Sequence, residues 1–329
     1  MSQFSRILSS ALVLVSLSAV SSAQSNPSPS GDPFLGRYEG TYKETGRENV
    51  AAVAEVIAEG RGLYRLRLDS DAVHLELHGA AAGPKLRFMG YSNNISWSGV
   101  VEDGKIRFGR SDSHYGGTFS FAKVVEHSPT EGLKPAKNAT VLLGMTSGKA
   151  DLGAWTNSKW ESLGDGVMRV KGGSGDNKTK DTHADIRLHL EFKTALMASS
   201  SGQQRSNSGI YFQDRYEVQI LDSFGVIPGS GDCGGIYEQS VAAVNACYPP
   251  GQWQTYDITF TAARLDKDGK VKKYPTVTVE HNGVLIQDAH EFKKVTGGAV
   301  NDKVVEEARM RLQDHSNPVE YRNIWWVKD

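Results

Sequence analysis

From Phe34 to Asp329 the chain consists of short segments in which apolar and polar residues alternate, and this pattern constrains the fold more than any other feature. A period of two places successive side chains on opposite faces of a strand. Glycine supports the same interpretation, because it makes up 35 of 329 residues, above the usual ~7%, and turns use it. Almost no segment has helical periodicity. The sequence therefore predicts an all-β protein.

The segments form two groups. The first, at residues 34–125, contains Asp103-Gly104, a strong signal for a two-residue hairpin turn, and a second turn marked by Gly60 and Gly62. We expect about six to eight antiparallel strands that close into a small sheet or barrel. This group carries no constellation of residues that demands chemistry, so we interpret it as an accessory domain.

The second group, at residues 139–329, follows a linker at residues 126–138, "EHSPTEGLKPAKN", which has two prolines and mixed charges. Its segments alternate clearly, and Asn282-Gly283 predicts another two-residue hairpin turn. Strands at regular spacing without helical periodicity are typical of an antiparallel β-sandwich. The sequence therefore predicts a small all-β domain followed by a β-sandwich.

The first residues resemble a targeting segment rather than part of the fold. Residues 1–23 have a weakly basic start with Arg6, an apolar run, and small residues before the expected cleavage after Ala23. The run is shorter than the ~20 apolar residues of a membrane-spanning helix, and Gln24 stands where a lipid anchor needs a cysteine. Residues 24–33, rich in Ser and Pro, form a linker. We expect a signal peptide and a secreted or periplasmic protein without a membrane anchor.

The charge balance argues against nucleic acid as a partner. The chain has 37 Lys and Arg against 38 Asp and Glu, which is a formal net charge of -1. Phosphate binding needs a surplus of basic side chains concentrated on one surface. The sequence does not indicate an oligomeric state.

Export also decides how the two cysteines are interpreted. An oxidising compartment lets Cys233 and Cys247 pair. The bridge would close a loop of about 15 residues, worth ~3 kcal/mol in the chain-entropy model. The alternative is two unpaired buried thiols, and the spacing gives no zinc signal because it lacks CxxC. A disulfide between Cys233 and Cys247 is the prediction.

Three predicted strands of the sandwich carry polar side chains along one face. They lie in "IRLHLEFKT", "RYEVQILD" and "RMRLQDHSN", where leucine, isoleucine, valine, tyrosine, phenylalanine and methionine alternate with the polar residues. The polar residues are Arg187, His189 and Glu191, then Glu217 and Gln219, and finally Arg309, Arg311, Gln313 and His315.

These faces have an unusual composition for a solvated surface, which favours Lys, Glu and Thr. Planar amides and guanidinium groups bind adjacent sugar hydroxyls in pairs, and aromatic rings stack on the apolar face of a pyranose. Asn207, Tyr211 and Trp253 add groups of the same kind. Alternation alone supports a carbohydrate groove and an ordinary solvated face equally.

Several blocks of the second domain resemble, in order, the 3-keto-disaccharide hydrolase family. They are "GDGVMRVKGGSGDNKTK", "IRLHLEFKT", "SNSGIYFQDRYEVQILDSFG", "CGGIYEQ", "PPGQWQTYDITF", "VTVEHNGVLIQD" and "RLQDHSNPVEYRNIWW". The resemblance covers about Thr140 to Asp329 and leaves the first domain outside. It implies a concanavalin A-like sandwich, or jelly roll, that acts on a small carbohydrate substrate.

Laminarinase-type glycosidases, which share this class of sandwich, have a catalytic strand of the form Glu-x-Asp-x-x-Glu. Residues 217–222, "EVQILD", are similar in spacing, but Gln219 replaces the middle Asp and Asp222 replaces the last Glu. Strict alternation also puts Asp222 on the opposite face unless a β-bulge intervenes. These departures put the ordinary two-carboxylate mechanism in doubt.

The resemblance instead implies cleavage of 3-keto-disaccharides or 3-keto-glycosides. A ketone at carbon 3 acidifies the hydrogen on carbon 2, so a base could remove it, expel the group on carbon 1 and let water add back. We expect Glu217 as the base, Arg311 with Gln219 as stabilisers of the oxyanion, and His315 or Glu191 as the acid. The candidate substrate-binding residues are Asn207, Tyr211, Trp253, Gln313 and Asp222.

Two other functions stay open. A conventional glycoside hydrolase would use Glu191 and Glu217, with the two carboxyls ~5 to 9.5 Å apart. A lectin-like protein would bind carbohydrate without catalysis, because fold alone does not determine function. We predict no cofactor. A divalent metal is weakly indicated by oxygen and nitrogen ligands near turns, without a recognisable loop spacing, namely Asp222, Asp232, Asp314 and His315.

Overall fold

The computed structural model describes residues 31–44, 48–70, 73–92, 94–110 and 117–329. The expected signal peptide, residues 1–23, and most of the linker at 24–33 lie outside these ranges and stay predictions. Among the described residues, none of the helical segments has the length and hydrophobicity of a membrane-crossing helix.

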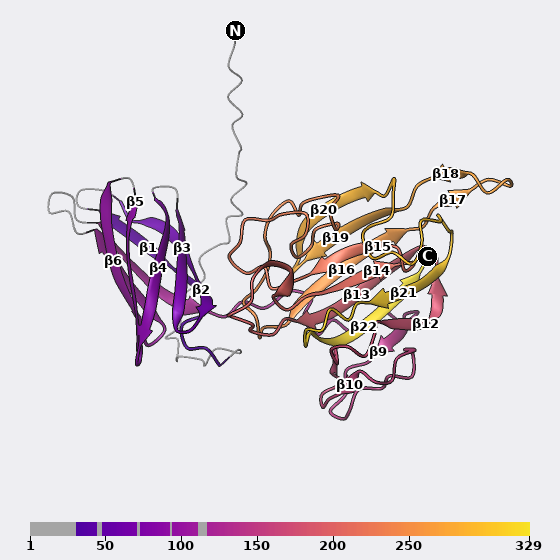
Figure 1. Ribbon diagram of the computed structural model, residues 1–329, viewed down its shortest axis with the longest axis horizontal. Coiled ribbons are helices and arrows are strands. Elements are labelled where there is room, and N and C mark those ends of the chain that lie inside the picture. The colour runs from indigo at the N-terminus through magenta and orange to yellow at the C-terminus, as the bar shows by residue number, and fades with distance from the viewer. Residues whose placement is uncertain (1–30, 45–47, 71–72, 93, 111–116) are drawn as a thin grey trace, which may run out of the picture.

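Eight antiparallel strands form a closed barrel at the N-terminal end, with each strand paired to the next and β1 paired to β8 (Figure 1). Closure removes the exposed sheet edges that would otherwise pair with other chains. The strands are β1 (Gly36–Glu44), β2 (Val50–Gly60), β3 (Leu63–Ser70), β4 (His74–Ala82), β5 (Lys85–Ser92), β6 (Ile95–Glu102), β7 (Lys105–Arg110) and β8 (Gly117–Val124).

Turn chemistry in the barrel follows the predicted hairpin signals. Asp103 and Gly104 join β6 to β7 with positive φ angles of 50° and 68°, as a type I′ hairpin turn requires. Gly60 and Gly62 also have positive φ, 84° and 73°, and lie at the turn from β2 to β3. The apolar side of each strand fills the barrel interior, and the predicted barrel is confirmed.

The C-terminal part is a sandwich of two antiparallel sheets (Figure 1). The larger sheet has the order β10-β11-β22-β13-β16-β19-β20, with β9 paired to β22. Its strands are β9 (Thr140–Leu143), β10 (Glu161–Ser162), β11 (Met168–Arg169), β13 (Ile186–Lys193), β16 (Gln254–Thr261), β19 (Thr276–His281), β20 (Val284–Glu291) and β22 (Glu320–Lys328).

The smaller sheet has the order β12-β21-β14-β15. Its strands are β12 (Asn177–His183), β21 (Ala308–Leu312), β14 (Ser208–Phe212) and β15 (Tyr216–Ile220). A short hairpin, β17 (Arg264–Leu265) with β18 (Val271–Lys273), extends from the sandwich, and η1 (Gly202–Gln204) is a single 3₁₀ turn among the described residues.

The two sheets enclose one apolar core. The predicted alternation is confirmed on both sides, because Leu188, Leu190 and Phe192 of β13 and Val218 and Ile220 of β15 are all buried in it. Glu217 and Gln219 therefore lie on the face of the smaller sheet that points away from the core. The predicted fold class, an all-β chain with a barrel before a sandwich, is confirmed.

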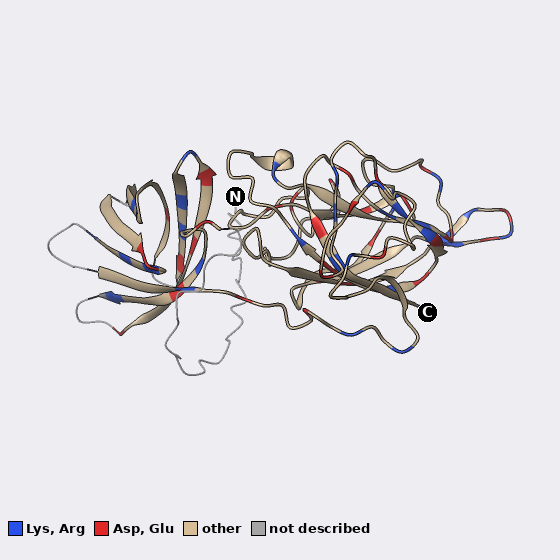
Figure 2. Cartoon of the chain, turned by 90° about the horizontal axis from the view of Figure 1, so that it is seen from below, with Lys and Arg blue, Asp and Glu red and all other residues tan. Residues whose placement is uncertain are grey.

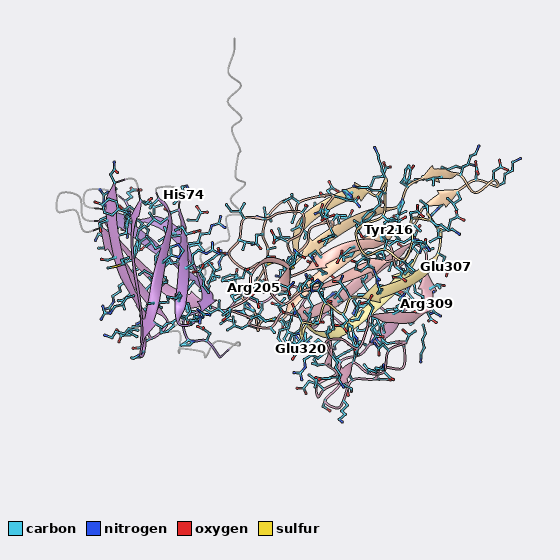
Figure 3. The ribbon with its side chains drawn as sticks, viewed as in Figure 1. His74, Arg205, Tyr216, Glu307, Arg309 and Glu320 are labelled. Atoms are coloured by element: carbon cyan, nitrogen blue, oxygen red, sulfur yellow. The ribbon has the colours of Figure 1, made fainter. Side chains whose placement is uncertain are left out.

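The barrel and the sandwich touch through the loop that precedes η1 and the loop that follows β15. Phe224 is buried in the core cluster of the barrel. Arg205, labelled in Figure 3 on the side of the sandwich that faces the barrel, donates from Nη1 to the carbonyl of Ala58 at 3.2 Å. Basic and acidic residues are interspersed along the chain in both parts (Figure 2).

Candidate active site

The floor of the candidate site is the outer face of the smaller sheet, where three strands lie side by side. The register pairs Tyr211 of β14 with Glu217 of β15 on one side and with Arg311 of β21 on the other. Directly opposite residues on antiparallel strands point to the same face of the sheet. One row of side chains across the sheet therefore consists of the Arg311 guanidinium, the Tyr211 phenol and the Glu217 carboxyl, in that order.

The next row leaves a hollow in its middle. Gly209 of β14 pairs with Gln219 of β15, and its carbonyl accepts a hydrogen bond from the backbone N–H of Gln313 at 3.0 Å. A Cβ atom at position 209 would overlap the Oε1 atom of Glu217. The glycine thus makes the space that the Glu217 carboxyl occupies.

A pocket of about 180 Å³ opens over these two rows. This volume equals roughly six water molecules at ~30 Å³ each, which suits one sugar ring rather than a longer chain. Six predicted residues line it, and they are Asn207, Tyr211, Glu217, Gln219, Gln313 and His315. The remaining lining residues are Gln203, Tyr237, Gly297 and Gly298.

The carboxyl of Glu217 has an unusual affinity for protons. Its side chain is buried, and this burial raises the pKa to about 7, against the opposing influence of Tyr211 and Arg311. A carboxyl with a pKa near neutral pH can both accept and release a proton under ordinary conditions. Perturbed carboxyls of this kind cluster at active sites.

The hydroxyl of Tyr211 can change its hydrogen-bond acceptor according to the protonation state of Glu217. Its hydroxyl lies 2.7 Å from Oε2 of Glu217 and 2.9 Å from the carbonyl of Gly297. The phenol has one proton and two acceptors, so it donates to Glu217 when that carboxyl is ionised and to Gly297 when the carboxyl is protonated. Burial and Glu217 raise the pKa of Tyr211, which keeps the phenol protonated.

Arg311 lies beneath the pocket rather than in its lining. Its guanidinium carbon is 3.8 Å from the centroid of the Tyr211 ring, and Nη2 donates to the carbonyl of Gly298 at 2.6 Å. Asp176 and Asp214 lie 3.1 and 2.9 Å from its nitrogens. These contacts favour a role in positioning Tyr211 over the direct contact with an oxyanion that the sequence suggested.

An amide network forms one wall of the pocket. Gln219 donates from Nε2 to Oε1 of Gln203 at 3.0 Å, and Asn207 donates to the same oxygen at 2.9 Å. Two amide oxygens in the lining, Oδ1 of Asn207 and Oε1 of Gln313, are buried and accept no hydrogen bond from the described residues. Buried acceptors without donors are rare, and hydroxyl groups of a ligand would satisfy them.

Besides Arg311, three further predicted residues lie outside this pocket. Asp222 accepts a hydrogen bond from Nε of Arg205 at 2.6 Å, at the end of the sandwich that touches the barrel. Trp253 packs against Arg322, with the guanidinium carbon 4.1 Å from its ring centroid. Glu191 lies on β13 of the larger sheet. The structure does not bring these three side chains to Glu217.

Glu191 belongs to a buried polar network under the segment at residues 126–138. Its carboxyl accepts hydrogen bonds from Nε of Arg322 at 2.6 Å, from Asn323 at 2.8 Å and from the backbone N–H of Gly132 at 2.6 Å. Burial alone would raise the pKa of Glu191, but these bonds and His189 lower it to about 2. The carboxyl is therefore ionised at neutral pH, and both of its oxygens accept hydrogen bonds.

A larger hollow, of about 330 Å³, lies on the outer face of the larger sheet beside His189 and Trp325. Nδ1 of His189 is 2.6 Å from Oδ1 of Asp257, and the imidazole stacks on Trp325 with ring centroids 5.2 Å apart. Among the charged groups beside this hollow, His189 and Asp257 are paired with each other and Arg187 is paired with Asp329. The smaller pocket, with its near-neutral carboxyl and unpartnered amides, is therefore the better candidate.

The two cysteines differ from the prediction. Cys233 and Cys247 are free thiols, and the Cys233 sulfur lies 3.1 Å from the hydroxyl of Tyr256. The predicted disulfide is therefore not present in the structure, because the two sulfurs are not at bonding distance.

The suggested oxygen-ligand metal set is not brought together either. Asp314 accepts a hydrogen bond from the backbone N–H of Gly175 at 2.8 Å, and Asp232 accepts one from that of Gly229 at 2.7 Å. Within the described ranges, the metal-capable clusters do not include Asp222, Asp232, Asp314 or His315.

Sequence reasoning missed part of the pocket wall. Gln203 lies in η1 and Gly297 and Gly298 lie in the loop after β20, where no periodicity marks a side chain's direction. Tyr237 is in the block "CGGIYEQ", which carried part of the resemblance, so the family pattern was the one signal that could have indicated it.

Comparison with known proteins places the pocket in a family context. The profile of the 3-keto-alpha-glucoside-1,2-lyase-like domain matches residues 140–327, a range that contains every residue lining the pocket. The crystal structure of a candidate glycosyl hydrolase from Parabacteroides distasonis ATCC 8503 is similar, with 36% identity, a TM-score of 0.53, and coverage of 59% of this chain and 84% of that chain. A second candidate glycosyl hydrolase from the same organism has 15% identity and a TM-score of 0.43, covering 62% and 98% of the two chains. No curated protein matches.

Proposed function

The chain belongs to the family of 3-keto-alpha-glucoside-1,2-lyase-like domains, and from this premise we propose that it cleaves the glycosidic bond of 3-keto-glycosides, with Glu217 as the base. The observation that carries the proposal is the near-neutral carboxyl of Glu217, held in a pocket for one sugar ring. A base works best when its pKa lies near the working pH.

The proposed reaction begins at carbon 2 of the keto sugar. Glu217 removes the proton there, and the electron pair of the C–H bond moves to form an enolate whose negative charge lies on the oxygen of carbon 3. The enolate then expels the oxygen attached to carbon 1, which leaves a double bond between carbons 1 and 2. Addition of water across that double bond completes a net hydrolysis, and release before this addition makes the enzyme a lyase.

Two lining residues supply the remaining chemistry in this proposal. Gln313 donates a hydrogen bond from its side-chain amide to the enolate oxygen, because it faces the same hollow as Glu217, while the one phenol proton of Tyr211 is donated to Glu217 or to Gly297. His315 protonates the leaving oxygen, since its half-buried ring has no hydrogen bond to a described residue and remains available. Gln219, held by Gln203 and Gly231, shapes the wall rather than reacting.

The pocket gives little support to a conventional two-carboxylate hydrolase. That mechanism needs a pair of carboxyls facing one sugar across ~5 to 9.5 Å. Glu217 is the only carboxylate among the residues that line the pocket, and Glu191 is ion-paired with Arg322 on the other sheet. A lectin has no need of a carboxyl with a raised pKa, although only an assay distinguishes binding from catalysis.

The test compares a 3-keto-disaccharide with its unoxidised parent. We expect cleavage of the keto sugar alone, and a loss of roughly 10²–10⁴-fold in kcat for Glu217→Gln. Glu238→Gln, an exposed neighbour of the pocket, serves as the matched control and should keep full turnover. Equal cleavage of the unoxidised parent, or full turnover by Glu217→Gln, would contradict the proposal.

Proton exchange separates the two halves of the reaction. In D₂O, the wild-type protein should exchange the hydrogen on carbon 2 of a 3-keto-glucoside, and Glu217→Gln should not. His315→Gln should retain the exchange but release the leaving group more slowly. Loss of exchange in His315→Gln together with normal exchange in Glu217→Gln would reverse the assigned roles.

A further inference from the structure

Two thiols and one imidazole lie close together behind the candidate active site. One ligand atom from each of Cys233, Cys247 and His281 lies within 4.8 Å of the other two, in the interior of the sandwich. Metal–sulfur bonds of ≈ 2.3 Å place two thiolates roughly 4 Å apart around a common ion. The three groups are therefore close to the separation at which they could share one ion.

The imidazole of His281 is oriented as a metal ligand would be. The backbone N–H of Tyr248 donates to Oε1 of Gln254 at 2.9 Å, which identifies that oxygen as an acceptor. Nε2 of His281 lies 2.9 Å from the same oxygen and must therefore carry the proton. The lone pair is left on Nδ1, and a hydrogen bond from the other ring nitrogen to an oxygen is what orients ligating histidines.

Nδ1 of His281 has no partner among the described residues, although the side chain is fully buried. An unpartnered buried nitrogen next to two thiols needs an explanation. A bound cation would provide one.

The chain holds the three groups in place through hydrogen bonds of their neighbours. Asn282, which follows His281, donates to the carbonyl of Ala246 at 2.8 Å, beside Cys247. The backbone N–H of Cys233 donates to Oγ of Ser223 at 3.0 Å. The first contact joins the end of β19 to the loop between β15 and β16, and the second joins two separate points within that loop.

We infer that Cys233, Cys247 and His281 form a binding site for one thiophilic cation with a filled d shell, either Zn²⁺ or Cu⁺. Thiolate and imidazole ligands select these ions over Mg²⁺ and Ca²⁺, which prefer oxygen. Each thiol that binds releases its proton to solvent, and no oxidant is required. The ion would be structural, because it lies in the protein interior.

The site would fix the wall of the active-site pocket. The backbone N–H of Gly234, next to Cys233, donates to the carbonyl of Gln219 at 3.0 Å, and Tyr256 donates to the same carbonyl at 2.8 Å. Gly231, two residues before Cys233, accepts hydrogen bonds from Gln203 and Gln219. An ion behind this loop would therefore hold the backbone against which the amide network is built.

The test measures metal content in the full-length protein. Cells are grown with added zinc or added copper, and the purified protein is assayed by elemental analysis. We expect about one ion per chain of one of these metals, lost in Cys247→Ser and in His281→Ala. His290→Ala, a half-buried histidine on β20 outside the cluster, is the matched control and should keep the ion.

A second measurement covers the case in which His281→Ala fails to fold. Adding Zn²⁺ or Cu⁺ to the metal-free protein should raise the thermal midpoint of the wild type and not that of Cys247→Ser, in which the changed side chain is half-buried. The cation that produces the larger rise in the thermal midpoint is the one that the site binds more tightly. A disulfide, seen as a mass two hydrogens lower with no reactive thiol, would overturn the inference. Free thiols without metal, or metal retained equally by the variants, would overturn it as well.

Discussion

Burial of the Glu217 carboxyl sets the pH at which it can act as a base. Its pKa is raised to about 7, so the ionised form becomes the main form only above neutral pH. We therefore expect kcat/KM for a 3-keto-disaccharide to rise as the pH increases through about 7 and then to level off. A profile measured from pH 5 to 9 tests this. A rise centred near the ordinary carboxyl value of 4.5 would show that another group is the base.

Because Glu217 is buried, its ionised form should lower the free energy of unfolding of the protein at high pH. The folded protein binds a proton on Glu217 more tightly than the unfolded chain does, so stability falls as the pH rises from 4.5 to about 7. We expect Glu217→Gln to raise the free energy of unfolding at pH 8 by at most about 3 kcal/mol and to change it little at pH 4. Urea unfolding at both pH values measures the difference. Equal effects at both would contradict the raised pKa.

Gly209 is needed because its missing side chain leaves space for the Glu217 carboxyl. In Gly209→Ala the new Cβ would overlap Oε1 of Glu217. We expect a loss of about 1–3 kcal/mol of stability from overpacking and a loss of turnover in the folded fraction. Gly164→Ala is the control, because no atom lies within 4 Å of the position of its Cβ. Normal kinetics in Gly209→Ala would show that the carboxyl can move without consequence.

The alternation of apolar and polar residues predicted which way side chains point on regular strands, but it gave no information about side chains in loops. Glu217 lies on a strand and Gln313 directly follows one, and the apolar residues of both strands face the core, so the direction of these two side chains was readable from the sequence. Gln203 lies in a 3₁₀ turn and was missed. Trp253 precedes β16, and its contact with Arg322 depends on tertiary packing that no local pattern encodes.

At the scale of elements, the segment at residues 126–138 not only links the barrel to the sandwich but also forms hydrogen bonds with the larger sheet. Thr130 donates to Asp257 at 2.7 Å, and the carbonyl of Leu133 accepts a hydrogen bond from Asn323 at 2.9 Å. The segment thus covers the polar face of β13. Alternation correctly grouped His189 and Glu191 on one face, but it could not show that this face belongs to a different sheet from Glu217.

Glu191 is expected to act in stability rather than in catalysis. Removing its charge in Glu191→Gln leaves Arg322 without its closest buried partner, and we expect a loss of about 3 kcal/mol at pH 7. The pKa of Glu191 is lowered to about 2, so the difference from wild type should shrink as the pH falls from 4.5 toward 2. Chemical unfolding and turnover per folded molecule are the measurements. Glu280→Gln, exposed on β19, is the control. If Glu191→Gln lowered turnover without lowering stability, Glu191 would have a role in catalysis.

At the scale of the whole molecule, one side chain from the sandwich completes the core of the barrel. Phe224 is buried among the barrel's apolar residues, and Leu196 packs against the same cluster. We expect Phe224→Ala to destabilise the protein by about 3 kcal/mol. Differential scanning calorimetry measures the loss. Ile227→Ala, in the same loop with 80% of its side chain exposed, should change stability by less than about 0.5 kcal/mol. Equal behaviour of the two variants would mean that the barrel and the sandwich are independent.

Arg205 touches the barrel with one nitrogen and Asp222 with another, and it lies between two residues of the pocket wall, Gln203 and Asn207. A tilt of the barrel would therefore move the amides of Gln203 and Asn207, each of which is two residues from Arg205 in the chain. Substitutions in the barrel would in this way change the shape of a pocket to which the barrel contributes no residue.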